Sequence, residues 1–89
     1  VAMAPHNPNG PLSVAQGIQA IAFVRNGHIF ETVGNEAEEE LAAQLLINPE
    51  VVRSKDGFIE LPTGPGIGVE INPEGLERRP FKRYYQTTR

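Results

Sequence analysis

Hydrophobic and polar positions follow two different patterns along the first third of the chain. The apolar run 1–4 is too short to show a period, but its composition suits a buried parallel strand. Residues 13–24 repeat their apolar side chains as one stripe of a helix, at Val14, Ile18, Ile21 and Ala22. A second short strand is predicted at 28–33. Strand, helix and strand in this order form the repeat unit of a parallel α/β protein.

Capping residues predict the ends of this first helix. Ser13 has the hydroxyl that satisfies free backbone N–H groups at a helix start. Arg25-Asn26-Gly27 is expected to end the helix, since asparagine and glycine tolerate a positive φ. Gly17 weakens the helix by about 1 kcal/mol relative to alanine, unless a neighbouring element packs closely against it.

A second helix is predicted to begin after Asn35. Asn35 is suited to cap it, and Glu38, three residues later, completes a variant of the capping box. Four glutamates occupy its first turns: Glu36, Glu38, Glu39 and Glu40. The helix dipole favours negative charge there, and consecutive side chains point around a helix, so we interpret them as a solvated face and not as a metal site. Ile47-Asn48-Pro49 is expected to end the helix.

In the remaining third of the chain, the sequence pattern predicts two short strands and the start of a further helix. A tight turn at Asp56–Gly57 precedes a strand at 58–61, and a loop rich in proline and glycine leads to a strand at 69–71. Asn72 followed by Pro73 is typical of a helix start, because proline suits the first helical position.

The segment 5–11, Pro-His-Asn-Pro-Asn-Gly-Pro, holds the main candidate for chemistry. An imidazole titrates near neutral pH, so His6 can take or give a proton during turnover. Barrel enzymes carry catalytic groups at the carboxyl ends of their strands, and the prolines would keep this loop stiff. The alternative is a loop histidine that only bonds a neighbouring backbone group.

The residues around His6 also carry a family resemblance. Ala4 to Pro11 resembles the seventh-strand histidine motif of the mandelate racemase subgroup of the enolase superfamily, on the branch of galactonate-type acid-sugar dehydratases. Ile29-Phe30-Glu31 resembles the end of the eighth barrel strand, where this family has a glutamate. Segments 55–58 and 65–71 resemble the C-terminal return into the capping domain, so that the resemblance covers roughly residues 1–77.

The resemblance implies an α/β fold: the C-terminal part of a (β/α)7β TIM-like barrel, with a segment that returns to an α+β capping domain. Residues 1–54 would supply the last barrel strands and helices, 55–77 the capping-domain segment, and 78–89 a basic tail outside the resemblance. A barrel of this kind takes about 250 residues, so the rest is expected from an upstream polypeptide. A homo-oligomer is also expected.

The implied activity is the Mg²⁺-dependent dehydration of a sugar acid to a 2-keto-3-deoxy acid. His6 would remove the proton α to the carboxylate or protonate the leaving hydroxyl, and its usual aspartate partner would lie outside this chain. A protonated Glu31 would donate a hydrogen bond to the developing enolate. No acid here matches the family's Mg²⁺ ligands, so they are expected outside the chain, and the 89 residues alone are expected to be inactive.

Asn7 and Asn9 are the candidates for binding substrate hydroxyls, although asparagines in such loops more often bond their own backbone. His28 is interpreted as a strand-start residue. The run Pro65–Gly68 lacks the lysine and the following helix of a phosphate-binding loop, so it is interpreted as a determinant of backbone shape.

The composition of the chain limits the classes of partner that we expect. A net charge of -3 gives no reason to expect a nucleic-acid or membrane partner, and the lack of cysteine excludes disulfides and thiolate metal sites. No apolar run approaches the ~20 residues of a membrane span, so the cytoplasm is the expected location. The basic, aromatic tail is expected to pack on a neighbouring subunit or domain.

Two alternatives stay open. One is a racemase or epimerase of the same superfamily, which the histidine alone does not exclude, although the Asn-Pro-Asn-Gly-Pro loop favours a dehydratase. The other is a non-catalytic interaction module that uses the basic tail or the acidic helix.

Overall fold

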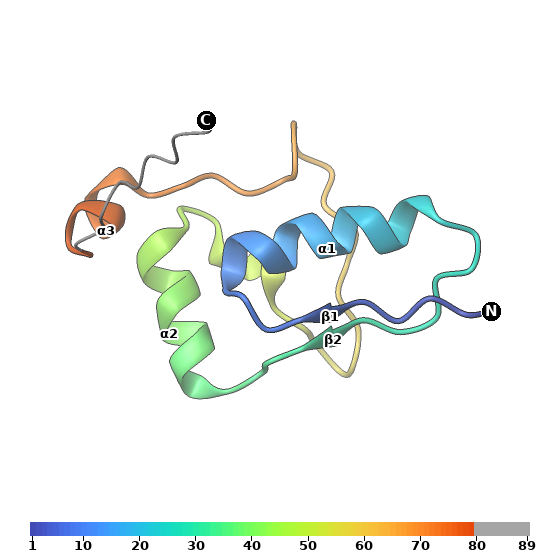
Figure 1. The fold of residues 1–89 in the computed structure, drawn as a ribbon. Helices are drawn as coiled ribbons and strands as arrows, with labels where there is room; N and C mark the ends of the chain where they lie inside the picture. Colours follow the sequence, from blue (N-terminus) through green and yellow to red (C-terminus); the bar gives the residue numbers. More distant parts are fainter. Residues whose placement is uncertain (80–89) are drawn as a thin grey trace, which may run out of the picture.

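A pair of short parallel strands, covered on one side by a helix, forms the N-terminal part of the chain (Figure 1). The computed structural model describes residues 1–79. Strand β1 (His6–Asn7) pairs in parallel with β2 (Glu31–Thr32), and helix α1 (Pro11–Phe23) connects them. The predicted order of strand, helix and strand is therefore confirmed as a small α/β unit. The first strand lies at His6–Asn7 and not at 1–4, where Met3 alone makes a single bridge, and both strands are shorter than expected.

The strand pair contains one extra residue on its second strand. Met3 forms a parallel bridge with Gly27, and further along His6 is the partner of Glu31. The step from Met3 to His6 is three residues, whereas the step from Gly27 to Glu31 is four. Such an insertion bends a strand and re-aims its side chains. Here it sets the register in which His6 and Glu31 lie side by side.

Only one face of this strand pair is covered. Met3 and Pro5 are half-buried and Asn7 is buried, whereas the alternate residues Ala4 and His6 are exposed. The prediction of a buried strand at 1–4 is thus wrong: Val1, Ala2 and Ala4 are exposed. The reason is that α1 lies on one side and no element of residues 1–79 covers the other.

Helix α1 begins two residues earlier than predicted, at Pro11. Proline supplies the fixed φ of a first helical residue, and Gly10 before it takes φ 92°, where glycine is unstrained. No side chain caps this helix, so the prediction that Ser13 is the cap is wrong. The helix ends at Phe23, and Gly27 does not adopt a positive φ.

Close packing of α1 against Asn7 of β1 and against Phe30, just before β2, explains the glycine inside the helix. A Cβ on Gly17 would lie 2.5 Å from a ring carbon of Phe30 and 2.6 Å from Nδ2 of Asn7. The expected reason for a glycine inside this helix, close packing by a neighbouring segment, is therefore confirmed. The buried residues of α1 lie along the same side: Pro11, Val14, Ala15 and Ile18.

Helix α2 (Glu36–Leu45) confirms the predicted cap. Oδ1 of Asn35 accepts a hydrogen bond from the backbone N–H of Glu38 at 2.9 Å. The helix ends before Ile47 as predicted, and a 3-10 turn, η1 (Pro49–Val52), follows. Ala42 and Leu46 are buried between α2 and its neighbours and complete the small core.

The two strands predicted at 58–61 and 69–71 do not form in the described residues. Lys55 and Phe58 make a single bridge, as do Leu46 and Ile71, and neither bridge extends into a ladder. The predicted tight turn is confirmed, because Asp56 and Gly57 both have positive φ, 54° and 83°. Without a longer partner strand, the apolar residues of this segment stay in extended loops.

Side-chain bonds of Asn48 hold the segment 62–72 together with the backbone bonds around the Leu46–Ile71 bridge. Nδ2 of Asn48 donates to the carbonyl of Gly68 at 2.9 Å, and its Oδ1 accepts from the N–H of Glu70 at 2.8 Å. Helix α3 (Pro73–Glu77) then begins with proline at its first position, as predicted, although the side chain of Asn72 does not cap it.

Three further predictions bear on the extent of the structure. The proposed boundaries at 54 and 77 remain predictions, and residues 80–89 of the predicted tail lie outside the described residues. None of the helices between residues 1 and 79 has the length and apolar character that crossing a membrane requires.

Candidate active site

His6 and Glu31 come together across the strand pair. They are direct partners in the register of β1 and β2, and Nδ1 of the imidazole contacts Oε1 of the carboxylate. Each residue lies where its strand approaches the loop that leads to the next helix. The sequence named these two residues as the catalytic candidates, and the backbone pairing is what brings them together.

The pair lies open to solvent in the described part of the chain. The His6 side chain is 69% exposed and the Glu31 side chain 64%. Ion pairs at such exposure contribute little to stability, because water screens them. The value of this contact is therefore geometric: it sets which ring nitrogen faces the carboxylate.

This geometry assigns different tasks to the two ring nitrogens of His6. When Nδ1–H donates to Glu31, Nε2 carries the lone pair and can accept a proton from another molecule. The sequence had placed the carboxylate partner of His6 outside the chain and had given Glu31 a hydrogen-bond donor role. In the structure Glu31 contacts Nδ1 of His6, and the aspartate partner outside the chain stays a prediction.

Asn7 lies on the other face of the strand, away from His6. Its side chain is 9% exposed and binds Ser13 twice. Nδ2 of Asn7 donates to the Ser13 carbonyl at 2.6 Å, and the Ser13 hydroxyl donates to Oδ1 of Asn7 at 2.6 Å. Both ends of the amide are thus engaged with α1, and the structure does not bring Asn7 to the candidate site.

Asn9 lies in the loop after β1 and is exposed. It lines an apolar cavity of about 190 Å³ together with Leu12, Leu41 and Leu76, which is formed by the start of α1, by α2 and by α3. The structure does not place Asn9 beside His6, and its role in substrate binding stays a prediction.

Ser13 is the residue that sequence reasoning misplaced. An Asn six residues before a Ser is not a recognised sequence motif, so the local sequence gives no signal for this contact. Only the turn of the chain at Gly10 brings the two side chains together.

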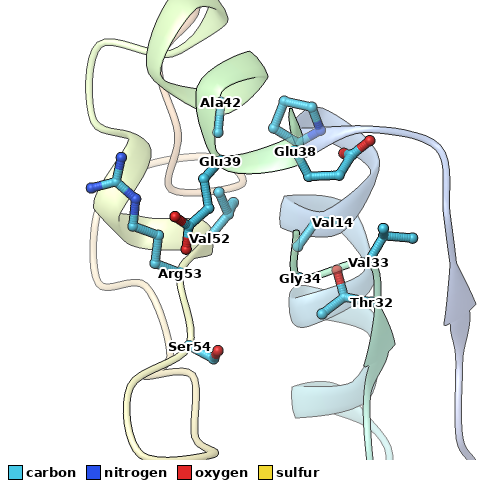
Figure 2. A pocket seen from close by; sticks show the side chains of 11 residues that line it. Val14, Thr32, Val33, Gly34, Glu38, Glu39, Ala42, Val52, Arg53 and Ser54 are labelled. Atoms are coloured by element: carbon cyan, nitrogen blue, oxygen red, sulfur yellow. The ribbon is translucent and has the colours of Figure 1, made fainter. Parts of the chain in front are cut away.

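A small cavity on the helix side of β2 is separate from the candidate site. It measures about 80 Å³, and its lining includes Thr32, Glu38 and Glu39 but neither His6 nor Glu31. Figure 2 shows that the carboxylates of Glu38 and Glu39 point to different sides of the cavity. They do not converge on one point, as expected for consecutive residues of a helix.

The described residues do not offer a place for a metal ion. Between residues 1 and 79, no three side chains of His, Cys, Asp or Glu gather around one point. Mg²⁺ needs several oxygen ligands in near-octahedral geometry, and the Glu31 carboxylate next to a histidine does not supply them.

Comparison with known proteins places the chain in a family. The family model described as "Enolase C-terminal domain-like" matches residues 1–75. The chain is 35% identical over 79 residues to the D-galactonate dehydratase of Variovorax paradoxus (strain S110). The aligned region covers 85% of this chain and 20% of that protein. It is also 35% identical over 75 residues to that of Verminephrobacter eiseniae (strain EF01-2), with coverage of 81% and 19%.

A third relative gives the same picture. The D-galactonate dehydratase of Xanthomonas campestris pv. campestris (strain B100) is 35% identical over 81 residues, which cover 88% of this chain and 21% of that protein. The chain therefore spans about a fifth of the length of the curated relatives it matches. No solved structure gives a significant match.

Proposed function

The chain belongs to the enolase C-terminal domain-like family, and on that premise we propose that it supplies the proton-transferring histidine of a sugar-acid dehydratase. The resemblance seen in the sequence is confirmed by the family match and by the relatives named D-galactonate dehydratase. One observation supports the assignment above others: His6 and Glu31 are register partners, and Nδ1 of His6 contacts the carboxylate.

His6 acts first as a base in this proposal. Its Nε2 takes the proton from the carbon α to the substrate carboxylate, and the electrons of that C–H bond form the enolate double bond. The bond from the β carbon to its hydroxyl then breaks, and the imidazolium gives a proton to the leaving oxygen. Water and an enol result, and the enol rearranges to the 2-keto-3-deoxy acid, so that atoms and charge balance.

Glu31 orients the imidazole during these steps. By accepting the Nδ1–H bond it fixes the tautomer with a free Nε2, and it stabilises the positive charge that appears after proton abstraction. The enolate hydrogen bond suggested for Glu31 stays a prediction beside this role. The orienting contact becomes effective only when water is excluded from the pair, because both side chains are exposed in the described residues.

The open face that carries the pair is where we place the rest of the site. We propose that an upstream polypeptide, the remainder of the barrel, covers this face and carries the carboxylate ligands of Mg²⁺. The described residues do not form a metal site, and none of the steps above uses the ion. The 89 residues alone are accordingly expected to be inactive.

A chimera tests the proposal. The chain replaces the matching fifth of the Variovorax paradoxus D-galactonate dehydratase, and the 2-keto-3-deoxy product is measured with D-galactonate and Mg²⁺. We expect activity in the chimera, and a decrease of about 10²–10⁴-fold in His6→Asn, which is the usual contribution of a general acid–base group. His28→Asn, the same change at an exposed histidine, should leave activity unchanged.

Several outcomes contradict the proposal. A folded chimera without activity on galactonate or other sugar acids would do so, as would full activity in His6→Asn. Dehydration by the isolated chain would show that no upstream polypeptide is needed. Exchange of the α proton with deuterated water, without loss of water, would indicate a racemase or epimerase instead.

A further inference from the structure

We infer that Asn7 and Ser13 are positioning residues for His6. They form a two-bond clip between strand β1 and the first turn of α1, and we refer to this pair of hydrogen bonds as the Asn7–Ser13 clip. The inference rests on the proposed function in one respect: it matters for catalysis only if His6 transfers the proton.

The Asn7–Ser13 clip satisfies both the oxygen and the nitrogen of the Asn7 amide. Both of its hydrogen bonds measure 2.6 Å and are partly buried, and Asn7 itself is 9% exposed, which limits the competition of water for these bonds. Buried amides that satisfy both their oxygen and their nitrogen are costly to disturb, since each lost partner leaves a polar group without a bond. Gly17 adds to this confinement, because the absence of a Cβ there leaves room for Asn7 Nδ2.

His6 has few other restraints of its own. It is adjacent to Asn7 in a strand of two residues, and its side chain points to the uncovered face with 69% of its surface exposed. The backbone around it bonds to β2 through the Glu31 N–H and the Pro5 carbonyl at 3.0 Å. Packing therefore does not fix the imidazole, and the strand that carries it is fixed from the opposite face by the clip.

Helix capping does not account for the clip. Gly10 occupies the cap position of α1, and the N–H of Val14 bonds to its carbonyl at 3.0 Å. The Ser13 hydroxyl is directed at the strand and not at a free N–H of its own helix. A serine that only served the helix would not require a buried asparagine beside the candidate base.

The test reads the state of the imidazole directly. In the full chain labelled with ¹⁵N-histidine, NMR shifts of the neutral ring report the share of the Nδ1–H tautomer. We expect wild type to show mainly this tautomer, and Ser13→Ala to lose that preference and approach Glu31→Gln. Ser13→Thr, which keeps the hydroxyl, should restore the preference. Gln16→Ala, at an exposed polar position of the same helix, should not change it.

A second variant covers the case in which Ser13→Ala fails to fold. Asn7→Leu with Ser13→Ala removes both partners together, so that no buried polar group is left without a bond, and such paired changes are tolerated better. The wild-type tautomer preference in either folded variant would overturn the inference. It would also be overturned if both variants were unfolded, because the clip would then be a determinant of the fold alone.

Kinetics in the chimera separate this inference from the proposed function. Misplacement of a catalytic group by about 1 Å can cost 10²-fold, so Ser13→Ala should lower kcat by up to this factor with little change in KM. An inactive chimera in which Ser13→Ala still changes the tautomer would contradict the proposed function and leave the positioning role in place. An unchanged tautomer with a lower kcat would contradict the positioning role.

Discussion

The two faces of the strand pair differ in what they carry. The face toward α1 holds Asn7 and Phe30 against Gly17, so closely that a Cβ there would lie 2.5 Å from the Phe30 ring and 2.6 Å from Asn7 Nδ2. The opposite face holds His6 and Glu31, both largely exposed and in contact with one another. Adjacent residues of one strand thus have opposite tasks, and the period of two along a strand is what separates them.

This difference shows how a short chain can hold reactive groups. The packed face fixes the backbone, and the backbone register then places the two candidate side chains, His6 and Glu31, although both are largely exposed. Parallel strands are ordinarily covered on both faces, so an uncovered face is the natural place for a partner element and a substrate. If this division is right, substitutions on the packed face should change stability, and those on the open face should change chemistry.

The largest stability effect is expected on the packed side, at Ile18. Its side chain is 3% exposed on α1, and Ile18→Ala leaves a cavity that typically costs about 2–5 kcal/mol. A domain of this size has little stability to lose, so the variant should unfold at much lower urea or lose its far-UV circular dichroism signal at 25 °C.

Ile29 provides the matched control for that prediction. Ile29→Ala makes the same chemical change two residues before β2, where the residue is 60% exposed, and should shift the free energy of unfolding by about 0.5 kcal/mol or less. Equal losses at both positions would show that the open face is packed in solution, and the comparison of the two faces would fail.

A smaller change in the free energy of unfolding, with a sign that can be predicted, is expected at Gly17. Gly17→Ala gains about 1 kcal/mol of helix propensity, but its Cβ would lie 2.5 Å from the Phe30 ring, and overpacking costs about 1–3 kcal/mol. We expect net destabilisation, measured by urea unfolding. At Gly34 a Cβ would meet no atom within 4 Å and φ is not positive, so Gly34→Ala should stabilise by up to about 1 kcal/mol.

If Gly17→Ala destabilises the protein and Gly34→Ala stabilises it, the close contact between α1 and the strand pair lies at Gly17. Stabilisation by Gly17→Ala would mean that α1 does not rest on β2 at this point. The Asn7–Ser13 clip would then lack the confinement that Gly17 gives it, because the same close approach brings Asn7 to the helix.

Local signals in the sequence predicted the elements that depend on neighbouring residues. The Asn35 cap, the end of α2 before Ile47 and the turn at Asp56–Gly57 follow from a few consecutive side chains, and all three are confirmed. His6 and Glu31 are named separately as catalytic candidates, Glu31 on the family resemblance. The contact between them is not predicted by the sequence, and their catalytic roles stay predictions.

Contacts between distant residues account for what the sequence did not predict. The strands expected at 58–61 and 69–71 have suitable composition, but a strand needs a partner, and the described residues supply only single bridges. Ser13 looked like a cap because a hydroxyl at a helix start usually is one. Its actual partner, Asn7, is determined by the path of the loop at Gly10, which no local pattern specifies.

The smallest effect is expected at Glu31, and it is the sharpest test of the comparison. The Glu31 side chain is 64% exposed and its contact with His6 is screened by water, so Glu31→Gln should change the free energy of unfolding by about 0.5 kcal/mol or less. Glu60→Gln, the same change at another exposed position, serves as control in urea unfolding. A loss well above 1 kcal/mol at Glu31 alone would mean that the open face also holds the fold together. A neutral result, combined with loss of the Nδ1–H tautomer of His6, would show that this carboxylate is kept for chemistry and not for stability.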